Sequence, residues 1–316
     1  MSVEYAIIVK NKTRLEALID RFNTKAQAKF YIERSGGNFE DYQAEHDAFH
    51  RSLDTVLAKL SKVIKYKIVE RIYVPAFIFT ENHLIVVIGQ DGLVANTAKY
   101  SEGAPIVAVN PDKNRYDGIL LPFDTSNFIG AVESVIENQH KFRSVTFAEA
   151  KLNDGQRLLG FNDLFIGASS HVSARYRITY QNQTEEHSSS GLIVSTPAGS
   201  TGWLSSVFNM TMGIGKLFFG LPIDQNRRNK KESHSQQPSL SQNQLFFAVR
   251  EPFKSVKTQT SIVAGYISSK TELTLESFMP ANGVIFSDGM ESDFLAFNSG
   301  AIARIGIAKE TATLVL

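Results

Sequence analysis

The sequence predicts a Rossmann-like α/β domain with a parallel sheet, followed by a mostly antiparallel β-sandwich domain. In the first part, short apolar runs bounded by turn residues alternate with stretches of helical spacing, which is typical of a parallel sheet covered by helices. After about residue 140, alternating apolar and polar residues between turn signals indicate antiparallel strands. We therefore expect an α/β domain over 1–130, a β-rich domain over 131–295, and a segment over 296–316 that could return to the first domain.

The first domain is expected to begin with a strand and a capped helix. Residues 5–9 form a short apolar run, and Thr13 and Glu16 have the spacing of a capping box, in which both side chains bind free amides at a helix start. Apolar residues at helical spacing from 49 to 64 predict a longer helix. Two parallel strands, whose carboxyl ends should open on a ligand crevice, are predicted at 84–88 and 106–109.

The second domain is predicted from turns and alternation. Asn153, Asp154 and Gly155 form a hairpin signal between strand-like runs at 143–150 and 156–159. Further strand-like runs lie at 176–180, 192–195, 245–249, 261–265, 272–276, 284–286, 301–307 and 313–316. The polar, low-complexity segment 224–244 is expected to be a loop, although its basic residues leave a phosphate-binding or nucleic-acid patch open.

Composition excludes several classes of protein. The chain has 316 residues, 43% hydrophobic and 21% charged, which suits a globular protein of one large or two ordinary domains. A net charge of +1 gives no overall attraction to nucleic acid or membranes. The absence of cysteine excludes disulfides, thiolate metal sites and cysteine nucleophiles. No apolar run approaches the roughly 18 residues that span a bilayer, and the start does not look like a signal peptide, so the cytoplasm is the expected compartment.

The most informative motif follows the apolar run at 84–88. It reads Gly89-Gln90-Asp91-Gly92-Leu93, an aspartate flanked by glycines at the end of a predicted buried strand. Glycines let a backbone come close to phosphate oxygens, and a carboxylate there can accept a hydroxyl proton or attract a metal ion. The alternative is an aspartate that caps the next helix or shapes the turn.

Four segments, taken in order, resemble the NAD kinases. The family's glycine-rich signature Gly-Gly-Asp-Gly-Thr is similar to residues 89–93, and its Asn-Glu/Asp pair is similar to Asn162-Asp163. Its Thr-Pro-x-Gly-Ser-Thr segment matches 196–201, and its late Asp-Gly resembles Asp288-Gly289. Short matches around 109–122, 189–192, 245–252 and 297–303 resemble the divergent mitochondrial-type NAD kinases and their bacterial relatives.

The resemblance implies an NAD kinase-like fold and an activity. It implies ATP- and Mg²⁺-dependent phosphorylation of NAD at the 2′-hydroxyl of its adenosine ribose, which gives NADP. Asp91 would accept or orient the hydroxyl proton as the catalytic residue. The implied partners are the small molecules NAD and ATP and a second copy of the chain in a homodimer, without nucleic acid or membrane.

The resemblance also implies a set of residues that bind the substrates. These are Gly89, Gly92, Asn162, Asp163, Thr196, Gly199, Ser200, Thr201, Trp203 and Asp288. Each has a structural alternative. Residues 196–201 could be a tight turn after a strand, the Asn162-Asp163 pair could simply begin a strand, and Asp288-Gly289 could be an ordinary turn. Trp203 could stack near adenine or belong to the core.

Two positions depart from the family pattern. Gln90 replaces a glycine, which would cost roughly 1 kcal/mol or more if that position needs a positive φ, and Leu93 replaces a threonine hydroxyl. A catalytically impaired NAD(P)-binding protein of the same fold is therefore the alternative function. Kinases with lipid or sugar acceptors share the glycine-rich signature but lack a segment like 196–201.

One histidine pattern resembles a metal-binding helix. His46 and His50 are four residues apart, a spacing that places two imidazoles on one helix face. The residue after His46 is Asp47 where such helices carry glutamate, and no third ligand is evident nearby. A solvated helix face is the favoured interpretation, and no protein metal site is predicted.

Overall fold

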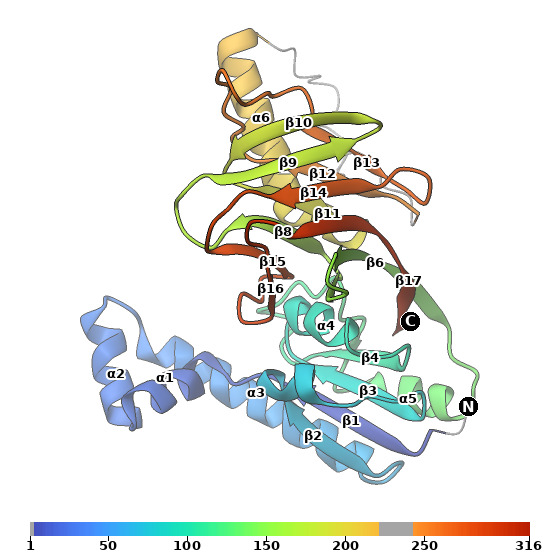
Figure 1. The fold of residues 1–316 in the computed structure, drawn as a ribbon. Coiled ribbons are helices and arrows are strands. Elements are labelled where there is room, and N and C mark those ends of the chain that lie inside the picture. Colours follow the sequence, from blue (N-terminus) through green and yellow to red (C-terminus); the bar gives the residue numbers. More distant parts are fainter. Residues whose placement is uncertain (1–2, 221–242) are drawn as a thin grey trace. The chain divides into compact units, whose positions relative to one another are not determined.

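The computed structural model describes residues 3–220 and 243–316, which divide into two compact units (Figure 1). Unit 1 comprises Met1–Ser144 and Ala312–Leu316, and unit 2 comprises Val145–Thr311. Most of the segment 224–244, expected to be a loop, lies outside the described residues. No helix within the described ranges is long and apolar enough to cross a membrane.

Unit 1 contains the predicted parallel sheet. Its strands run in the order β17–β4–β3–β1–β2, with the short β5 also paired to β4. Their bounds are β1 (Tyr5–Lys10), β2 (Tyr66–Glu70), β3 (His83–Ile88), β4 (Pro105–Asn110), β5 (Phe123–Asp124) and β17 (Ile302–Val315), of which only the end from Ala312 belongs to unit 1. Near its end, β17 pairs in parallel with β4 through Thr313 and Leu314. The strands are parallel because helical segments connect them, as the apolar runs predicted.

Helices bury one face of this sheet. Apolar side chains of α3 (Phe39–Leu60) and α5 (Phe128–Ile136) form one core with those of β1, β3 and β4. The helix α3 is longer than predicted, because Asn38 caps it ten residues earlier than the apolar spacing suggested, and it ends before Val63 and Ile64.

A small helical group precedes α3 in the chain. The capping box at the start of α1 (Arg14–Phe22) is confirmed: Thr13 Oγ1 accepts from the amide of Glu16, and Glu16 Oε2 accepts from the amide of Thr13 at 2.7 Å. The helix α2 (Lys25–Arg34) was not predicted, because few of its residues are buried. Its Ala28 and Ile32 pack with residues of α1 and α3 in a small separate core.

Unit 2 is an antiparallel sandwich. One sheet has the order β10–β9–β14–β17 with β6 and β7 beside it, and the other has the order β13–β12–β11–β8–β15–β16. The bounds are β6 (Phe142–Leu152), β7 (Arg157–Gly160), β8 (Asp163–Ala168), β9 (Ala174–Tyr180), β10 (Gln183–Ser189), β11 (Leu192–Ser195), β12 (Leu245–Val249), β13 (Ala264–Ile267), β14 (Leu273–Ser277), β15 (Gly283–Ser287) and β16 (Phe294–Ala296). Tyr176 and Leu275 of the first sheet share a core with Ile166 and Phe247 of the second. The predicted fold class is confirmed.

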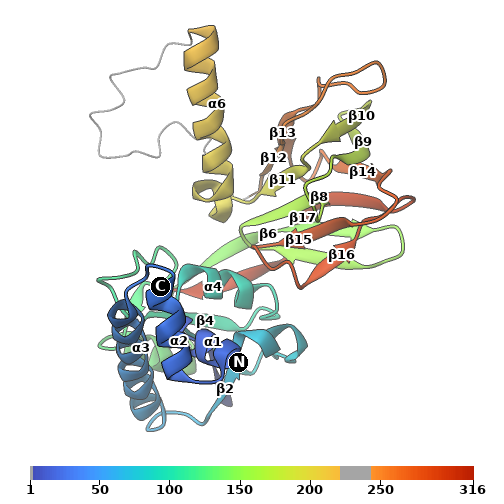
Figure 2. The same ribbon diagram turned by 90° about the vertical axis from the view of Figure 1, so that its left-hand side faces the viewer.

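The first turns of the helix α6 (Trp203–Phe219) pack on the second sheet, and the rest of the helix extends away from it (Figure 2). Leu204 and Trp203 pack there with Phe165, Phe246 and neighbouring apolar side chains. Two strand predictions needed correction. The runs at 301–307 and 313–316 belong to one strand, β17, and the run at 261–265 is displaced to β13.

Candidate functional site

Asp91 is the first residue of α4 (Asp91–Ala98), which begins immediately after β3. The preceding Gly89 is buried and Gln90 is exposed, while Asp91 is partly exposed. A carboxylate in the first turn interacts favourably with the helix dipole. The sequence therefore places a partly accessible acid at the carboxyl end of a buried parallel strand, where α/β sheets bind ligands.

A loop after β4 holds the Asp91 carboxylate. Its Oδ1 accepts a hydrogen bond from the amide of Leu120 at 2.6 Å. The loop is shaped by Asn110, which is 3% exposed and donates from Nδ2 to the carbonyl of Tyr116 at 3.0 Å. Gly118 has a φ of +66°, and a Cβ there would lie 2.6 Å from Asn110 Nδ2. The Asn110 side chain therefore builds the loop that positions Asp91.

The departures from the family signature are accommodated locally. Gln90 has a φ of −98° in extended backbone, so the strain that a positive φ would impose does not arise. Leu93 is 5% exposed, and a Cβ on Gly89 would lie 2.8 Å from its Cδ2. Leu93 thus packs beneath the turn, and a side chain at position 89 would have to displace the Leu93 methyl group. A Cβ at Gly92 would meet no atom within 4 Å.

In unit 2, Asp288 organises the turn before β8. Its carboxylate accepts from the amides of Phe161 at 3.0 Å, Asn162 at 2.6 Å and Asp163 at 3.4 Å. Asp288 itself has a φ of +54°, and Gly289 follows at +67°. The sequence placed Asp288 among the binding residues or in a turn, and its observed contacts are those of a turn that holds the Asn162-Asp163 pair.

The segment 196–201 lies directly against the same turn. Thr196 is fully buried; its Oγ1 donates to the carbonyl of Phe161 at 2.5 Å and accepts from the amide of Gly199 at 3.2 Å. The Thr196 amide donates to the carbonyl of Asn162 at 2.9 Å. The Thr196 hydroxyl therefore serves the fold. Ser200 donates to the carbonyl of Pro197, and Thr201 is exposed.

Gly199 provides the first testable prediction, because a Cβ there would lie 2.0 Å from the carbonyl oxygen of Asn162. Gly199→Ala should lower the free energy of unfolding by about 2 kcal/mol or more through overpacking. Chemical denaturation would measure it. In the control Gly213→Ala, within α6, the new Cβ meets nothing within 4 Å, and helix propensity should raise stability by roughly 0.5–1 kcal/mol. An equal effect at both positions would contradict the close approach.

The structure thus brings together five predicted residues from three segments of unit 2. They are Asn162, Asp163, Thr196, Gly199 and Asp288. Gly89, Asp91 and Gly92 form the second group, in unit 1. Sequence reasoning missed Leu120 and the positioning role of Asn110, since only the folded loop shows these contacts.

The pKa of Asp163 depends on its burial and on the nearby carboxylate of Asp288. Asp163 is 8% exposed, and burial, with the nearby charge of Asp288 as a second cause, raises the pKa of Asp163 to about 7. Near neutral pH a substantial fraction of Asp163 therefore carries a proton. A protonated carboxyl in such a place can donate a hydrogen bond, which an ionised one cannot do.

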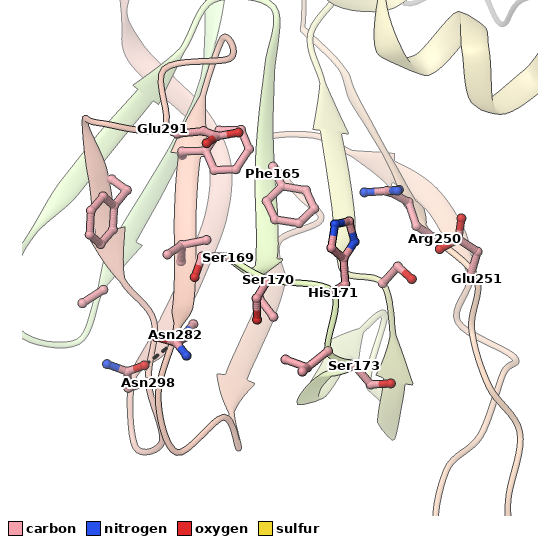
Figure 3. Close-up of a pocket in the computed structure, with 18 of the residues that line it drawn as sticks. Phe165, Ser169, Ser170, His171, Ser173, Arg250, Glu251, Asn282, Glu291 and Asn298 are labelled. Atoms are coloured by element: carbon pink, nitrogen blue, oxygen red, sulfur yellow. Dashed lines mark hydrogen bonds between the residues drawn. The ribbon is translucent and has the colours of Figure 1, made fainter.

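A cavity of about 1170 Å³ lies in unit 2 (Figure 3). Phe165 and Trp203 form an aromatic wall, with ring centroids 5.6 Å apart and planes at 10°, and Arg250 lies over Trp203 at 5.3 Å. Among the predicted residues described, Trp203 alone lines this cavity. The Asp163 end of β8 and the Ala168 end, where Ser169 and Ser170 line the cavity, are opposite ends of one strand. Phe165 and Trp203 nevertheless follow Asp163 and Thr201 by two residues each, so the aromatic wall of the cavity adjoins the Asp163 cluster along the chain.

Sequence comparisons find distant relatives. No protein-family model matches the chain. The NAD kinase of Heliobacterium modesticaldum is 31% identical over 128 residues, which cover 38% of this chain and 44% of that protein. The NAD kinase of Finegoldia magna is 29% identical over 181 residues, which cover 54% of this chain and 61% of that protein. The matches thus span about half the length of these curated relatives.

Solved structures share the fold over almost the whole chain. The crystal structure of yeast NADH kinase complexed with NADH has a TM-score of 0.56 at 14% identity, covering 100% of this chain and 84% of that one. An NAD kinase from Archaeoglobus fulgidus in complex with ATP has a TM-score of 0.55 at 14% identity, covering 99% and 94%. At such identity the likeness establishes the fold alone.

Proposed function

We propose that this distant relative of the NAD kinases transfers the terminal phosphoryl group of ATP to the 2′-hydroxyl of the adenosine ribose of NAD, giving NADP and ADP. One observation carries the proposal. Asp91 lies partly exposed at the start of α4, directly after a buried parallel strand, with its carboxylate oriented by the Leu120 amide. A fixed, accessible carboxylate at that place suits proton abstraction from a hydroxyl.

Asp91 would accept the hydroxyl proton as the ribose oxygen attacks the γ-phosphorus and the bond to ADP breaks. The glycines on either side of Gln90 and Asp91 suit the approach of phosphate, since Gly92 is exposed and leaves open space. The chemistry of the carboxylate also fits Mg²⁺, which is usually held by one or two carboxylates together with substrate phosphates. When bound, Mg²⁺ would neutralise phosphate charge beside Asp91.

The cluster in unit 2 would hold the dinucleotide. Asn162 is partly exposed, and its backbone is fixed by Asp288 and Thr196. Asp163, when protonated, can donate to an acceptor atom of the substrate. Ser200 and Thr201 are accessible at the turn before α6, whereas Thr196, Gly199 and Asp288 support the backbone.

A direct assay tests the proposal. The purified full chain, incubated with ATP, Mg²⁺ and NAD, should form NADP, measured by chromatography or by coupling to an NADP-specific dehydrogenase. Failure to form NADP with ATP or polyphosphate as donor would overturn the proposal. We also propose membership of the mitochondrial-type branch and a homodimer, and light scattering of the purified protein would test the dimer.

The second candidate is an NAD(P)-binding protein without phosphoryl transfer. The observation that favours it is the buried position of Leu93, which supplies no hydroxyl at the turn beneath Gly89. Calorimetry that shows NAD or NADP binding without any turnover would support this candidate over the kinase.

The Gln90 and Leu93 positions provide a second testable prediction. If the departures impair transfer, Gln90→Gly combined with Leu93→Thr should raise NADP formation. Because Leu93 is buried, the threonine should cost roughly 1–3 kcal/mol of stability, while Gln90→Gly alone should cost about 1 kcal/mol or less. Activity assays and denaturation of the single and double variants would separate the two effects. Unchanged activity in a folded double variant would show that the turn is not the defect.

A further inference from the structure

Three potential metal ligands lie close together in unit 1. All three precede Asp91 by more than forty residues in the sequence. Glu16 comes from α1, and His46 and His50 come from α3. One ligand atom from each lies within 4.8 Å of the others. The third ligand that sequence analysis did not find is therefore Glu16, which is thirty positions from His46 in the chain.

The two histidines share one face of α3 because they are one helical turn apart. Their ring centroids lie 4.3 Å apart. His50 Nε2 lies 3.0 Å from Glu16 Oε1, and His46 Nδ1 lies 3.0 Å from Thr13 Oγ1. A hydrogen-bond partner on one ring nitrogen is the usual way in which a metal-binding imidazole is oriented.

Glu16 is held in place by the capping box. Its Oε2 accepts from the amide of Thr13, which leaves Oε1 directed at His50. An ion pair of Arg14 with Glu45 also joins α1 to α3. The ligands therefore stand on two helices that are already tied together, a rigidity that metal sites need.

The Glu16–His50 ion pair and the Thr13–His46 hydrogen bond hold the three potential ligands in place. Two imidazoles with one carboxylate are a ligand set found in zinc sites that keep a fourth position for water. Mg²⁺ prefers oxygen ligands, so this set discriminates against it.

We propose that Glu16, His46 and His50 form a site for one Zn²⁺ or a similar transition-metal ion, which ties α1 to α3. The site takes imidazole-binding metals and is chemically distinct from the Mg²⁺ expected with nucleotide phosphates. The proposal does not depend on the kinase activity of the chain.

Cobalt provides a spectroscopic test on the full chain. After treatment with a chelator and dialysis, the protein is titrated with Co²⁺ in the presence of excess Mg²⁺. We expect visible absorption that saturates at one Co²⁺ per chain and is abolished by one equivalent of Zn²⁺. Zn²⁺ should also raise the midpoint of thermal unfolding. Absence of saturable Co²⁺ and Zn²⁺ binding would overturn the proposal.

Matched variants assign the ligands. Glu16→Gln keeps a side chain that can complete the capping box but removes the carboxylate, and His46→Gln and His50→Gln remove one imidazole each. Each substitution should weaken Co²⁺ binding by more than the roughly 10–100-fold that is typical when only a hydrogen-bond partner of a metal ligand is lost. The control His83→Gln, in unit 1 outside the cluster, should bind like the unmodified protein.

The metal-free stability of each variant separates ligand loss from misfolding. A variant that unfolds near the temperature of the metal-free parent, yet no longer gains stability from Zn²⁺, supports the site. If the folded Glu16 and histidine variants retain the parent's affinity, or if His83→Gln loses binding to the same extent, the assignment is wrong.

Discussion

Asp91→Asn should lower the rate of NADP formation by roughly two to four orders of magnitude, the usual contribution of a positioned general base. The amide cannot accept the hydroxyl proton. Its oxygen can still accept from the Leu120 amide, so the loop and the fold should persist. Steady-state assays with saturating ATP and NAD would measure the loss in kcat.

Two controls sharpen this prediction. Asp54→Asn makes the same chemical change at an exposed position of α3 and should leave activity unchanged. Asp91→Ala should also lose activity and, by leaving the Leu120 amide without its acceptor, should lower stability by about 1–3 kcal/mol. A folded Asp91→Asn protein with more than a tenth of the parent activity would rule out the assigned role.

The second large effect is expected in the pH dependence of stability. The pKa of Asp163 is raised from 3.8 to about 7, first by burial and then by Asp288. Between those values the folded state binds more protons than the unfolded state, so the free energy of unfolding falls as pH rises. At pH 8 the ionised carboxylate should cost roughly 4 kcal/mol, at about 1.4 kcal/mol for each pH unit between the two pKa values.

Asp163→Asn should therefore stabilise the protein, and more at pH 8 than at pH 5, by a difference of roughly 2–3 kcal/mol. Urea denaturation of parent and variant at both pH values would measure it. The control Asp154→Asn concerns an exposed carboxylate whose pKa is lowered by the amide and side chain of Gln156, so its effect should not change between pH 5 and 8. An Asp163→Asn effect that is equal at both pH values would contradict the raised pKa.

The fold class was predictable because local patterns reflect burial. The sequences of β3 and β4 are apolar at successive positions because side chains on both faces of these strands are buried. Alternation in β9 and β14 reflects a strand with one face in the sandwich core. The polar edge strand β10 carries no such signal, which is why it was not predicted.

The boundaries depended on contacts that periodicity does not record. Asn38 sets the start of α3 through a cap, and the pairing of β17 with β14 and then β4 makes two predicted runs into one strand. The contacts within the candidate site depended on the folded chain for the same reason. The motifs named its segments, but they did not distinguish Asp288 as the acceptor of backbone amides from a residue that contacts substrate.

The amino-acid sequence by itself determined most of the strands and helices, that an aspartate follows a buried strand between glycines, and that the chain resembles the NAD kinases. These features follow from hydrophobic period, turn chemistry and short motifs, all of which are local. The tertiary structure alone decided that Leu120 orients Asp91, that Asp163 is buried beside Asp288, and that Glu16 meets His46 and His50. Residues far apart in the chain come together there, and the burial and charge that set their chemistry exist only once the chain has folded.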